Sequence, residues 1–165
     1  MAIPQKIIKF LERNKAKYET IKHRTVYTAF DKAATLRVSQ KIIGKTLVVK
    51  LDKNPALVLI PANKNLDKQK LKKIAKAKSV DFLKEAWMKK NLKGVKIGAV
   101  PPFGLQPGHH PTRKMSTFAD KTLLKEQKII VNAGDYNSSI KITPANLKKL
   151  MPNLITGNFS QARSR

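Results

Sequence analysis

The first half of the chain switches between the helical and the strand spacing of apolar residues. Residues 4–16 carry apolar side chains on one helical face and charged side chains on the other, which predicts an amphipathic helix. Residues 18–23 alternate briefly and predict a strand. Thr28 begins a second, short helix, because Asp31 follows it at the spacing of a capping box. The side chains that we expect this helix to bury are Ala33, Ala34 and Leu36.

A β-hairpin is the clearest sheet signal in the sequence. The segments Thr46–Leu51 and Ala56–Pro61 are rich in Val, Leu and Ile, and the turn-forming run Asp52-Lys53-Asn54-Pro55 lies between them.

A third helix is expected at about 66–78. Lysines surround most of this helix, so its outer face is either a solvated surface or one that contacts RNA. Its expected cap is Asn65 or Asp67, and its expected inward residues are Leu71, Ile74 and Ala75.

Gly and Pro interrupt the second half of the chain more often. A short helix that holds the single tryptophan is expected at 81–92, and strands are expected at 129–132 and 139–142. The segment Gly98–Gly104 contains two prolines and cannot form a regular helix or a central strand. Residues 105–116 are polar and predict a loop. The last elements expected are a helix from Thr143-Pro144 to about Met151 and a frayed tail from Ser160 to Arg165.

These elements together indicate one domain. A chain of 165 residues is enough for one compact domain, and no internal repeat or long linker divides it. Strands and helices intermix without strict βαβ alternation, which favours an α+β fold with a curved mixed sheet over a doubly wound fold. We therefore expect the domain to span residues 1–155 and a C-terminal tail to follow over 156–165.

Charge is the strongest signal in the composition. Thirty-five Lys and Arg against ten Asp and Glu give a formal net charge of +25, which attracts polyanions. Most of the excess is lysine, which suits phosphate contacts better than base-specific ones.

The absence of cysteine excludes disulfides, thiolate metal sites and a cysteine nucleophile. With no signal-peptide pattern and no apolar run near membrane-spanning length, we expect a soluble cytoplasmic protein with no membrane partner.

Few catalytic signatures are visible. There is no dinucleotide-binding, phosphate-loop, zinc-protease or serine-hydrolase motif. His23 is isolated, and His109 and His110 are adjacent in sequence, which makes them poor joint ligands, so no metal site is expected. Lys45 stands at the mouth of a strand, where it can meet a phosphate or a carbonyl group. The loop that begins at Gly98 can hold an oxyanion on its N–H groups, although a structural turn explains the same residues.

Two motifs and several shorter segments occur together in an order that carries a resemblance. The motifs are the pair Lys45-Thr46 entering the hairpin and the G-x-x-x-P loop from Gly98 to Pro102. The other matching residues are His23, Tyr27-Thr28-Ala29, Leu57–Pro61, Leu66-Asp67, Lys70-Leu71, Phe118-Ala119-Asp120, Ile130–Gly134 and Ile140. Over roughly residues 3–150, the chain resembles the YbaK-type aminoacyl-tRNA deacylases, which share a fold with the insertion domain of prolyl-tRNA synthetase. A longer stretch between Gly104 and Asp120, with His109 and His110, departs from that pattern and borders the expected pocket.

The resemblance implies a fold, an activity and a site. The fold is a mixed, mostly antiparallel curved sheet flanked by helices, and no cofactor is implied. The activity is hydrolysis of the ester that joins a wrong amino acid to the tRNA 3′ end, with tRNA(Pro) carrying alanine, cysteine or serine as the expected substrate. The residues in catalytic positions are Lys45 and Gly98, and those that line the pocket are His23, Thr28, Thr46, Ala99, Val100, Pro102, Asn132 and Gly134. The implied partners are the tRNA acceptor stem and an aminoacyl-tRNA synthetase.

An aminoacyl ester is already activated, so such an enzyme needs no serine or cysteine nucleophile. We expect backbone N–H groups around Gly98–Val100 to stabilise the oxyanion and Lys45 to act as a positioning charge near the terminal phosphate or ribose. Two rival hypotheses explain the charge equally well, a non-catalytic RNA-binding protein and a synthetase-associated module that has lost turnover. Few aromatic residues weaken the first of these hypotheses. A metal hydrolase is the remaining alternative, and it lacks ligands.

Overall fold

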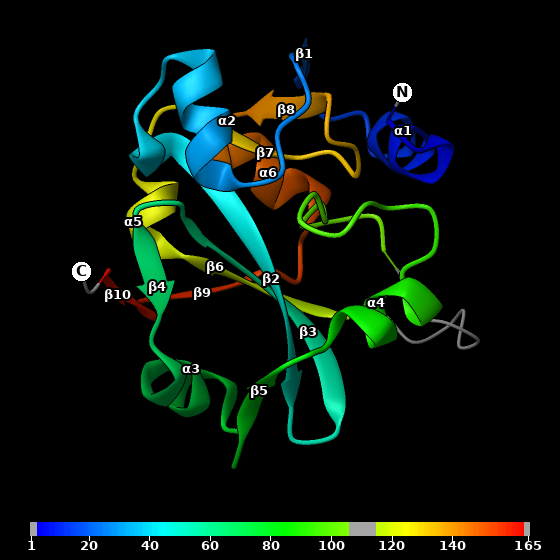
Figure 1. Ribbon diagram of the computed structural model, residues 1–165. Helices are drawn as coiled ribbons and strands as arrows, with labels where there is room; N and C mark the ends of the chain where they lie inside the picture. The colour runs from blue at the N-terminus through cyan, green and yellow to red at the C-terminus, as the bar shows by residue number, and fades with distance from the viewer. Residues whose placement is uncertain (1–2, 106–114, 164–165) are drawn as a thin grey trace.

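The two central strands of the sheet, β2 (Ile43–Leu51) and β3 (Asn54–Pro61), form a long hairpin in the computed structural model, which describes residues 3–105 and 115–163 (Figure 1). The other strands of this sheet are β1 (Glu19–Lys22), β5 (Val80–Phe82), β6 (Ser116–Asp120), β7 (Ile129–Asn132), β8 (Ser138–Ile142) and β9 (Ile155–Gly157). Their order is β1-β8-β7-β2-β3-β6-β9, and β5 pairs with β2 outside this path. A separate two-stranded ribbon joins β4 (Lys64–Leu66) to β10 (Ser160–Ala162).

The main sheet mixes both strand directions. The pairs β1–β8, β8–β7, β2–β3 and β2–β5 are antiparallel, whereas β7–β2, β3–β6 and β6–β9 are parallel. Six α-helices of the described residues pack around this sheet, which confirms the expected α+β fold with a mixed, mostly antiparallel sheet. The helices are α1 (Gln5–Arg13), α2 (Ala29–Leu36), α3 (Lys68–Ala75), α4 (Glu85–Asn91), α5 (Lys121–Leu124) and α6 (Pro144–Leu150).

Side-chain caps define where several helices begin. The Thr28 hydroxyl accepts a hydrogen bond from Asp31 N at 3.0 Å and caps α2, as the sequence predicts. Asp67, one of the two expected caps, accepts from the first amides of α3. Thr143 caps α6, and Pro144 occupies its first turn, where a missing N–H costs nothing. None of the helices in the described ranges is long and apolar enough to cross a membrane.

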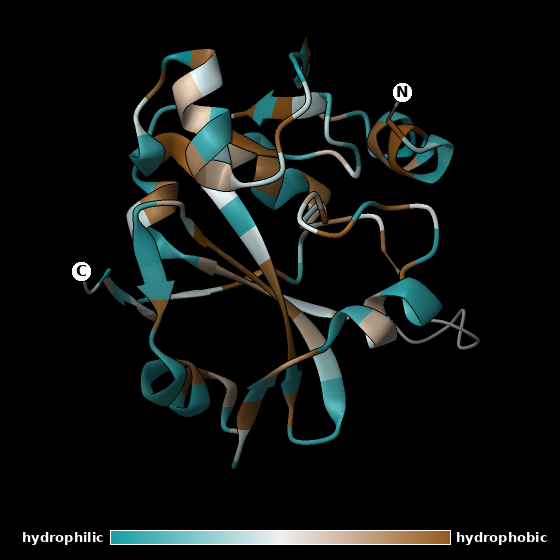
Figure 2. Ribbon diagram, in the orientation of Figure 1, coloured by the Kyte–Doolittle hydropathy of each residue, from teal (hydrophilic) through white to brown (hydrophobic). Residues whose placement is uncertain are grey.

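Alternation along the strands divides the core between the two faces of the sheet. On β3, Leu57 and Leu59 join the larger cluster, which contains the apolar sides of α1 and α6 and the residues that follow Gly98. Val58 and Ile60 point the other way, towards α3 and Phe159. A third, small cluster lies under α2. Apolar residues accordingly run along the strands, and polar residues cover the outer sides of α1 and α3 (Figure 2).

The structure corrects several local expectations. The side chain that α2 buries beside Ala33 is Lys32, whereas Ala34 is exposed. Val80–Phe82, expected at the start of a helix, is strand β5, because β2 offers it a free edge there. Ser116–Asp120, expected partly as loop, is strand β6 between β3 and β9. The pair His109 and His110 lies outside the described residues.

The end of the described chain is ordered rather than frayed. Phe159 is completely buried, and its N–H donates to the Asp120 carboxylate at 2.9 Å. Beyond it, β10 pairs residue by residue with β4. The expectation of a frayed tail from Ser160 is therefore wrong for Ser160–Ala162, because long-range pairing supplies the hydrogen bonds that a local pattern does not reveal.

Candidate functional site

The edge of β2 that faces away from β3 is paired at both ends and open in the middle. β7 pairs with Ile43 and Gly44, and β5 pairs with Val49–Leu51. Val48 O also accepts a hydrogen bond, from Leu83 N at 3.0 Å. No described strand pairs on this edge with Lys45–Leu47, so the residues that begin the matching motif lie at a gap between β7 and β5 along β2.

Lys45 and Asn132 project from the same face of the sheet. Gly44 is opposite Val131 in the parallel register, so Lys45 stands one step further along, level with Asn132, the last residue of β7. Because side chains alternate between faces, both project from the face that α2 covers. Burial lowers the pKa of the half-buried Lys45 amine, and the positive charge of Arg163, just after β10, lowers it further.

A second lysine of this face is more deeply buried. Lys32 of α2 is 4% exposed, and its ammonium donates a hydrogen bond of 2.5 Å to Asn132 Oδ1. Burial lowers the pKa of Lys32 to about 8. The amide Nδ2 of Asn132 in turn donates to Val100 O at 3.4 Å. One polar chain therefore connects α2, the end of β7 and the loop that begins at Gly98.

This loop is fastened to the connection between β7 and β8. Gly134 N donates to Ala99 O at 2.8 Å, and Lys96 N donates to Gly134 O at 2.9 Å. The hydroxyl of Tyr136 adds a hydrogen bond of 2.6 Å to Ile97 O. Among the sequence-predicted pocket residues, Ala99, Val100, Pro102 and Gly134 are all buried. The loop is thus held in one position relative to Asn132.

Gly98 itself is exposed and has a backbone that favours glycine. Its φ of 87° lies in the left-handed region, and a Cβ atom there would stand 3.1 Å from Tyr27 O. The N–H of the next residue, Ala99, already donates to Lys96 O at 3.0 Å. Within the described ranges the Gly98 and Val100 N–H groups have no acceptor, so both are candidates for binding an oxyanion.

The three remaining sequence-predicted residues differ in what their polar atoms already contact. Thr46 projects from the opposite face to Lys45, and its buried hydroxyl makes no hydrogen bond with any described residue. The Thr28 hydroxyl is occupied as the cap of α2. Both ring nitrogens of His23 have partners, Ser139 Oγ at 2.9 Å and Arg24 O at 2.8 Å. His23 therefore ties β1 to β8, and the structure does not bring it to Lys45 by any contact.

Lys32 and Tyr27 are the residues of this region that sequence reasoning missed as site candidates. Lys32 occurs among 35 Lys and Arg, so nothing in its type marked it. The only available signal was position, since it lies one turn after the Thr28 cap and directly before the buried Ala33.

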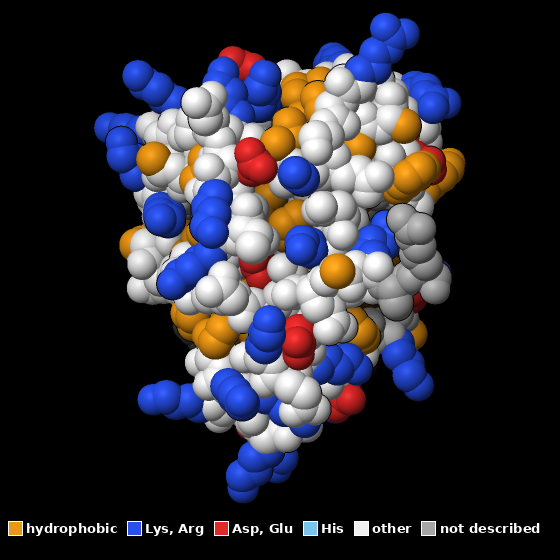
Figure 3. Space-filling view, turned by 90° about the vertical axis from the view of Figure 1, so that its left-hand side faces the viewer, with side chains coloured by type: hydrophobic (Ala, Val, Ile, Leu, Met, Phe, Trp, Pro, Cys, Tyr) orange, Lys and Arg blue, Asp and Glu red, His pale blue; other side chains and the backbone are white. Residues whose placement is uncertain are grey.

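Basic side chains spread over the face that contains α2, β4 and the described C-terminus, and acidic ones are few there (Figure 3).

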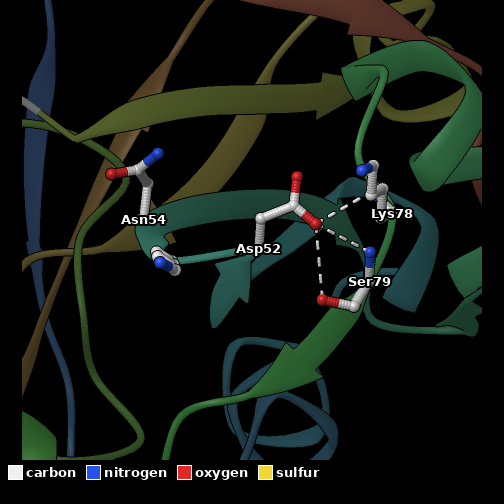
Figure 4. Close-up of a pocket in the computed structure, with 5 residues that line it drawn as sticks. Asp52, Asn54, Lys78 and Ser79 are labelled. Atoms are coloured by element: carbon white, nitrogen blue, oxygen red, sulfur yellow. Dashed lines mark hydrogen bonds between the residues drawn. The ribbon is translucent and has the colours of Figure 1, made fainter.

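An open surface hollow of the described residues lies elsewhere. It has a volume of about 520 Å³ and is lined by Asp52, Lys53, Asn54, Lys78 and Ser79 at the tip of the hairpin (Figure 4). The Asp52 carboxylate there already accepts hydrogen bonds of 2.9 Å from the N–H groups of Lys78 and Ser79. At about 3.3 Å per residue, this hollow is roughly 20 Å along β2 from Lys45. It holds a turn in place and is not the candidate site.

Comparison with known proteins identifies the family of the chain. Residues 23–150 match the aminoacyl-tRNA editing domain family, and this range includes Lys45, the Gly98 loop and Asn132. No curated protein sequence matches the chain significantly.

Solved structures share the fold at low sequence identity. The hypothetical protein APE2540 has a TM-score of 0.81 and 23% identity, with 94% of this chain and 99% of that chain covered. A protein described as a "putative trans-editing enzyme for prolyl tRNA synthetase" has a TM-score of 0.78 and 20% identity, with 96% of each chain covered. Identities this low demonstrate a common fold only. The family match extends over most of the chain, and the protein therefore belongs to the aminoacyl-tRNA editing domain family.

Proposed function

We propose that this protein is a trans-editing hydrolase that removes a wrong amino acid from the 3′ end of a tRNA. The observation that carries the proposal is the chain of contacts Lys32–Asn132–Val100, which connects α2, the end of β7 and the Gly98 loop at the position in the sheet that is level with Lys45. The family match supports an editing role. The substrate we favour is tRNA(Pro) that carries a small amino acid such as alanine, cysteine or serine.

The proposed reaction needs positioning and charge stabilisation rather than a protein nucleophile. Water adds to the ester carbonyl carbon, the carbonyl oxygen becomes an oxyanion, and the N–H groups of Gly98 and Val100 stabilise it. The bond from carbon to the ribose oxygen then breaks. The leaving ribose oxygen takes up the proton from the attacking water and becomes a hydroxyl group. Loss of one such donor in other enzymes raises the barrier by about 3–4 kcal/mol.

Lys45 serves as a positioning charge in this proposal. Its amine is half-buried and close enough to Arg163 for their charges to repel, so an anion between them would relieve that repulsion. The terminal phosphate of the tRNA 3′ end is the anion nearest to the ester. The basic surface around the site would then hold the acceptor stem, and we propose a synthetase as a second partner that releases the mischarged tRNA in the cytoplasm.

The test is ester loss from a panel of mischarged tRNAs, with Ala-, Cys- and Ser-tRNA(Pro) among them. The wild-type protein should release the amino acid, and Lys45→Ala should lower kcat/KM roughly 10- to 100-fold, which corresponds to one lost charge-assisted hydrogen bond. Lys50→Ala is the matched control, because Lys50 is an exposed lysine of the same strand. Full activity of Lys45→Ala would remove Lys45 from the mechanism.

The same panel separates the rival function. Binding of uncharged tRNA that weakens steeply with salt, together with no ester loss from any panel member, would favour a non-catalytic RNA-binding or synthetase-associated module. Binding that barely changes with salt would contradict the phosphate-dominated contact that both hypotheses assume.

A further inference from the structure

Tyr27 is an aromatic side chain that the proposed mechanism leaves without a role. It directly precedes the Thr28 cap of α2, and 64% of its surface is exposed. Thr25 and Thr28 beside it are exposed and polar, Phe30 three residues further along is exposed as well, and the three apolar clusters of the protein do not include Tyr27.

The ring is held in place rather than left to rotate freely. The rings of Tyr27 and Tyr136 meet at a steep angle with 4.8 Å between their centroids, and the Tyr136 hydroxyl donates a hydrogen bond of 2.6 Å to Ile97 O. Tyr27 thus shares a partner with the loop that leads into Gly98. Because most of the Tyr27 side chain is exposed, the ring offers aromatic surface to a ligand next to that loop.

The backbone of Tyr27 also contacts the proposed oxyanion site. A Cβ atom built on Gly98 would come within 3.1 Å of Tyr27 O, so the two backbones are in close contact. Lys32, one turn after Thr28, follows on the same helix. The ring therefore stands beside the place where the proposed mechanism puts the ester.

We propose that Tyr27 is a stacking platform for the unpaired base of the last nucleotide at the tRNA 3′ end. The inference rests on the proposed function, because the ester and that base are attached to the same ribose, so a protein that holds one at Gly98 holds the other nearby. Stacking accepts any base and needs only a free aromatic face, and the strongly positive surface supplies attraction to the phosphates. The ligand class is thus a single-stranded nucleotide end.

The test uses uncharged acceptor-stem hairpin RNAs that end either in an unpaired adenosine or in an abasic ribose. At one fixed salt concentration, the wild-type protein should bind the abasic RNA roughly tenfold more weakly. Tyr27→Leu keeps an apolar side chain against Tyr136 and removes the aromatic face, so it should bind both RNAs equally and weakly. Tyr27→Phe should restore the preference. Phe82→Ala is the matched control, because Phe82 is 52% exposed on β5 and Lys68 covers it at 4.8 Å from the ring centroid.

Equal binding of the two RNAs by the wild-type protein, or a preference that survives in Tyr27→Leu, would overturn the inference. Loss of the preference in Phe82→Ala would also overturn it, since the effect would then not belong to Tyr27. Failure of the inference and failure of the proposed function give different results. A protein that hydrolyses the ester but ignores the terminal base contradicts only the stacking platform, whereas base-dependent binding without ester loss contradicts only the hydrolase.

Discussion

Replacing Lys32 by methionine should change how the stability of the domain depends on pH. The Lys32 ammonium is buried, and burial lowers its pKa to about 8, whereas the same amine in the unfolded chain has the ordinary value of 10.5. Between pH 8 and pH 10.5 the unfolded chain therefore binds more protons at this site than the folded domain. Since stability rises with pH wherever the unfolded state binds more protons, the free energy of unfolding should increase across this window.

The magnitude follows from the two pKa values. The pKa of Lys32 falls from 10.5 in the unfolded chain to about 8 in the folded domain. At about 1.36 kcal/mol per pH unit, this difference corresponds to about 3 kcal/mol of unfavourable charge burial, all of it present below pH 8. Lys32→Met removes this cost and keeps most of the aliphatic chain. It also leaves Asn132 Oδ1 without its donor, which costs about 1–3 kcal/mol. At pH 7 the variant should thus be about as stable as the wild type or slightly more stable, and near pH 10.5 the wild type should be the more stable protein.

Urea unfolding between pH 7 and pH 10.5, followed by Trp87 fluorescence, measures this difference directly. The quantity to compare is the wild-type free energy of unfolding minus that of Lys32→Met at each pH, because the titration of other lysines cancels in it. Lys50→Met removes an exposed lysine of β2 and controls for general charge loss. A difference that stays constant across the range would refute the claim that Lys32 is a buried charged amine.

Two further substitutions test the loop and the C-terminal segment. Gly98→Ala places a Cβ atom on a residue with a φ of 87°, 3.1 Å from Tyr27 O. It should therefore cost about 1–2 kcal/mol of stability, measured by thermal unfolding, and lower ester hydrolysis at least tenfold, measured on the tRNA panel. Normal activity of this variant would contradict the role of the loop. Phe159→Ala should cost about 3–5 kcal/mol, visible as a Tm lower by roughly 10 °C, because this ring is completely buried; an unchanged Tm would contradict its place in the core.

The sequence predicted those parts of the fold whose signals are local. The cap Thr28 with Asp31, the cap Asp67 and the Thr143-Pro144 start each depend on residues within one turn, and each is observed. The central hairpin also needs only its own alternation and turn. Its turn was shorter than predicted, since Asp52 adopts a φ of 55° and pairing resumes at Asn54.

The missed strands all depend on distant partners. β6 carries a mixed run of polar and apolar residues, and it becomes a strand because β3 and β9 flank it. β10 contains only Ser160, Gln161 and Ala162, which have no strand propensity of note, yet it pairs with β4 about a hundred residues earlier. Such pairing is a property of the assembled sheet and cannot be predicted from spacing along the chain.

The candidate site divides in the same way. The motif residues Lys45 and Gly98 could be picked from sequence because their spacing resembles a known family pattern. Lys32 could not, because its burial arises only when α2 packs over β2 and β7. His23 was placed at the pocket by the resemblance alone; both of its ring nitrogens make hydrogen bonds within the domain, and its pocket position stays a prediction.

The features of this region that oppose stability lie close together. A charged amine is buried without a carboxylate partner among the described residues, a threonine hydroxyl is buried without a hydrogen bond, and a glycine is held at a positive φ. The buried amine and the buried hydroxyl are unfavourable in a core, and a fold under selection for stability alone would replace Lys32 and Thr46 with apolar residues. Local violations of this kind concentrate where a binding or catalytic role maintains them. An anionic ligand at the open edge of β2 would offset the positive charges of Lys32 and Lys45, which project from the same face, and this supports the proposed location of the tRNA 3′ end.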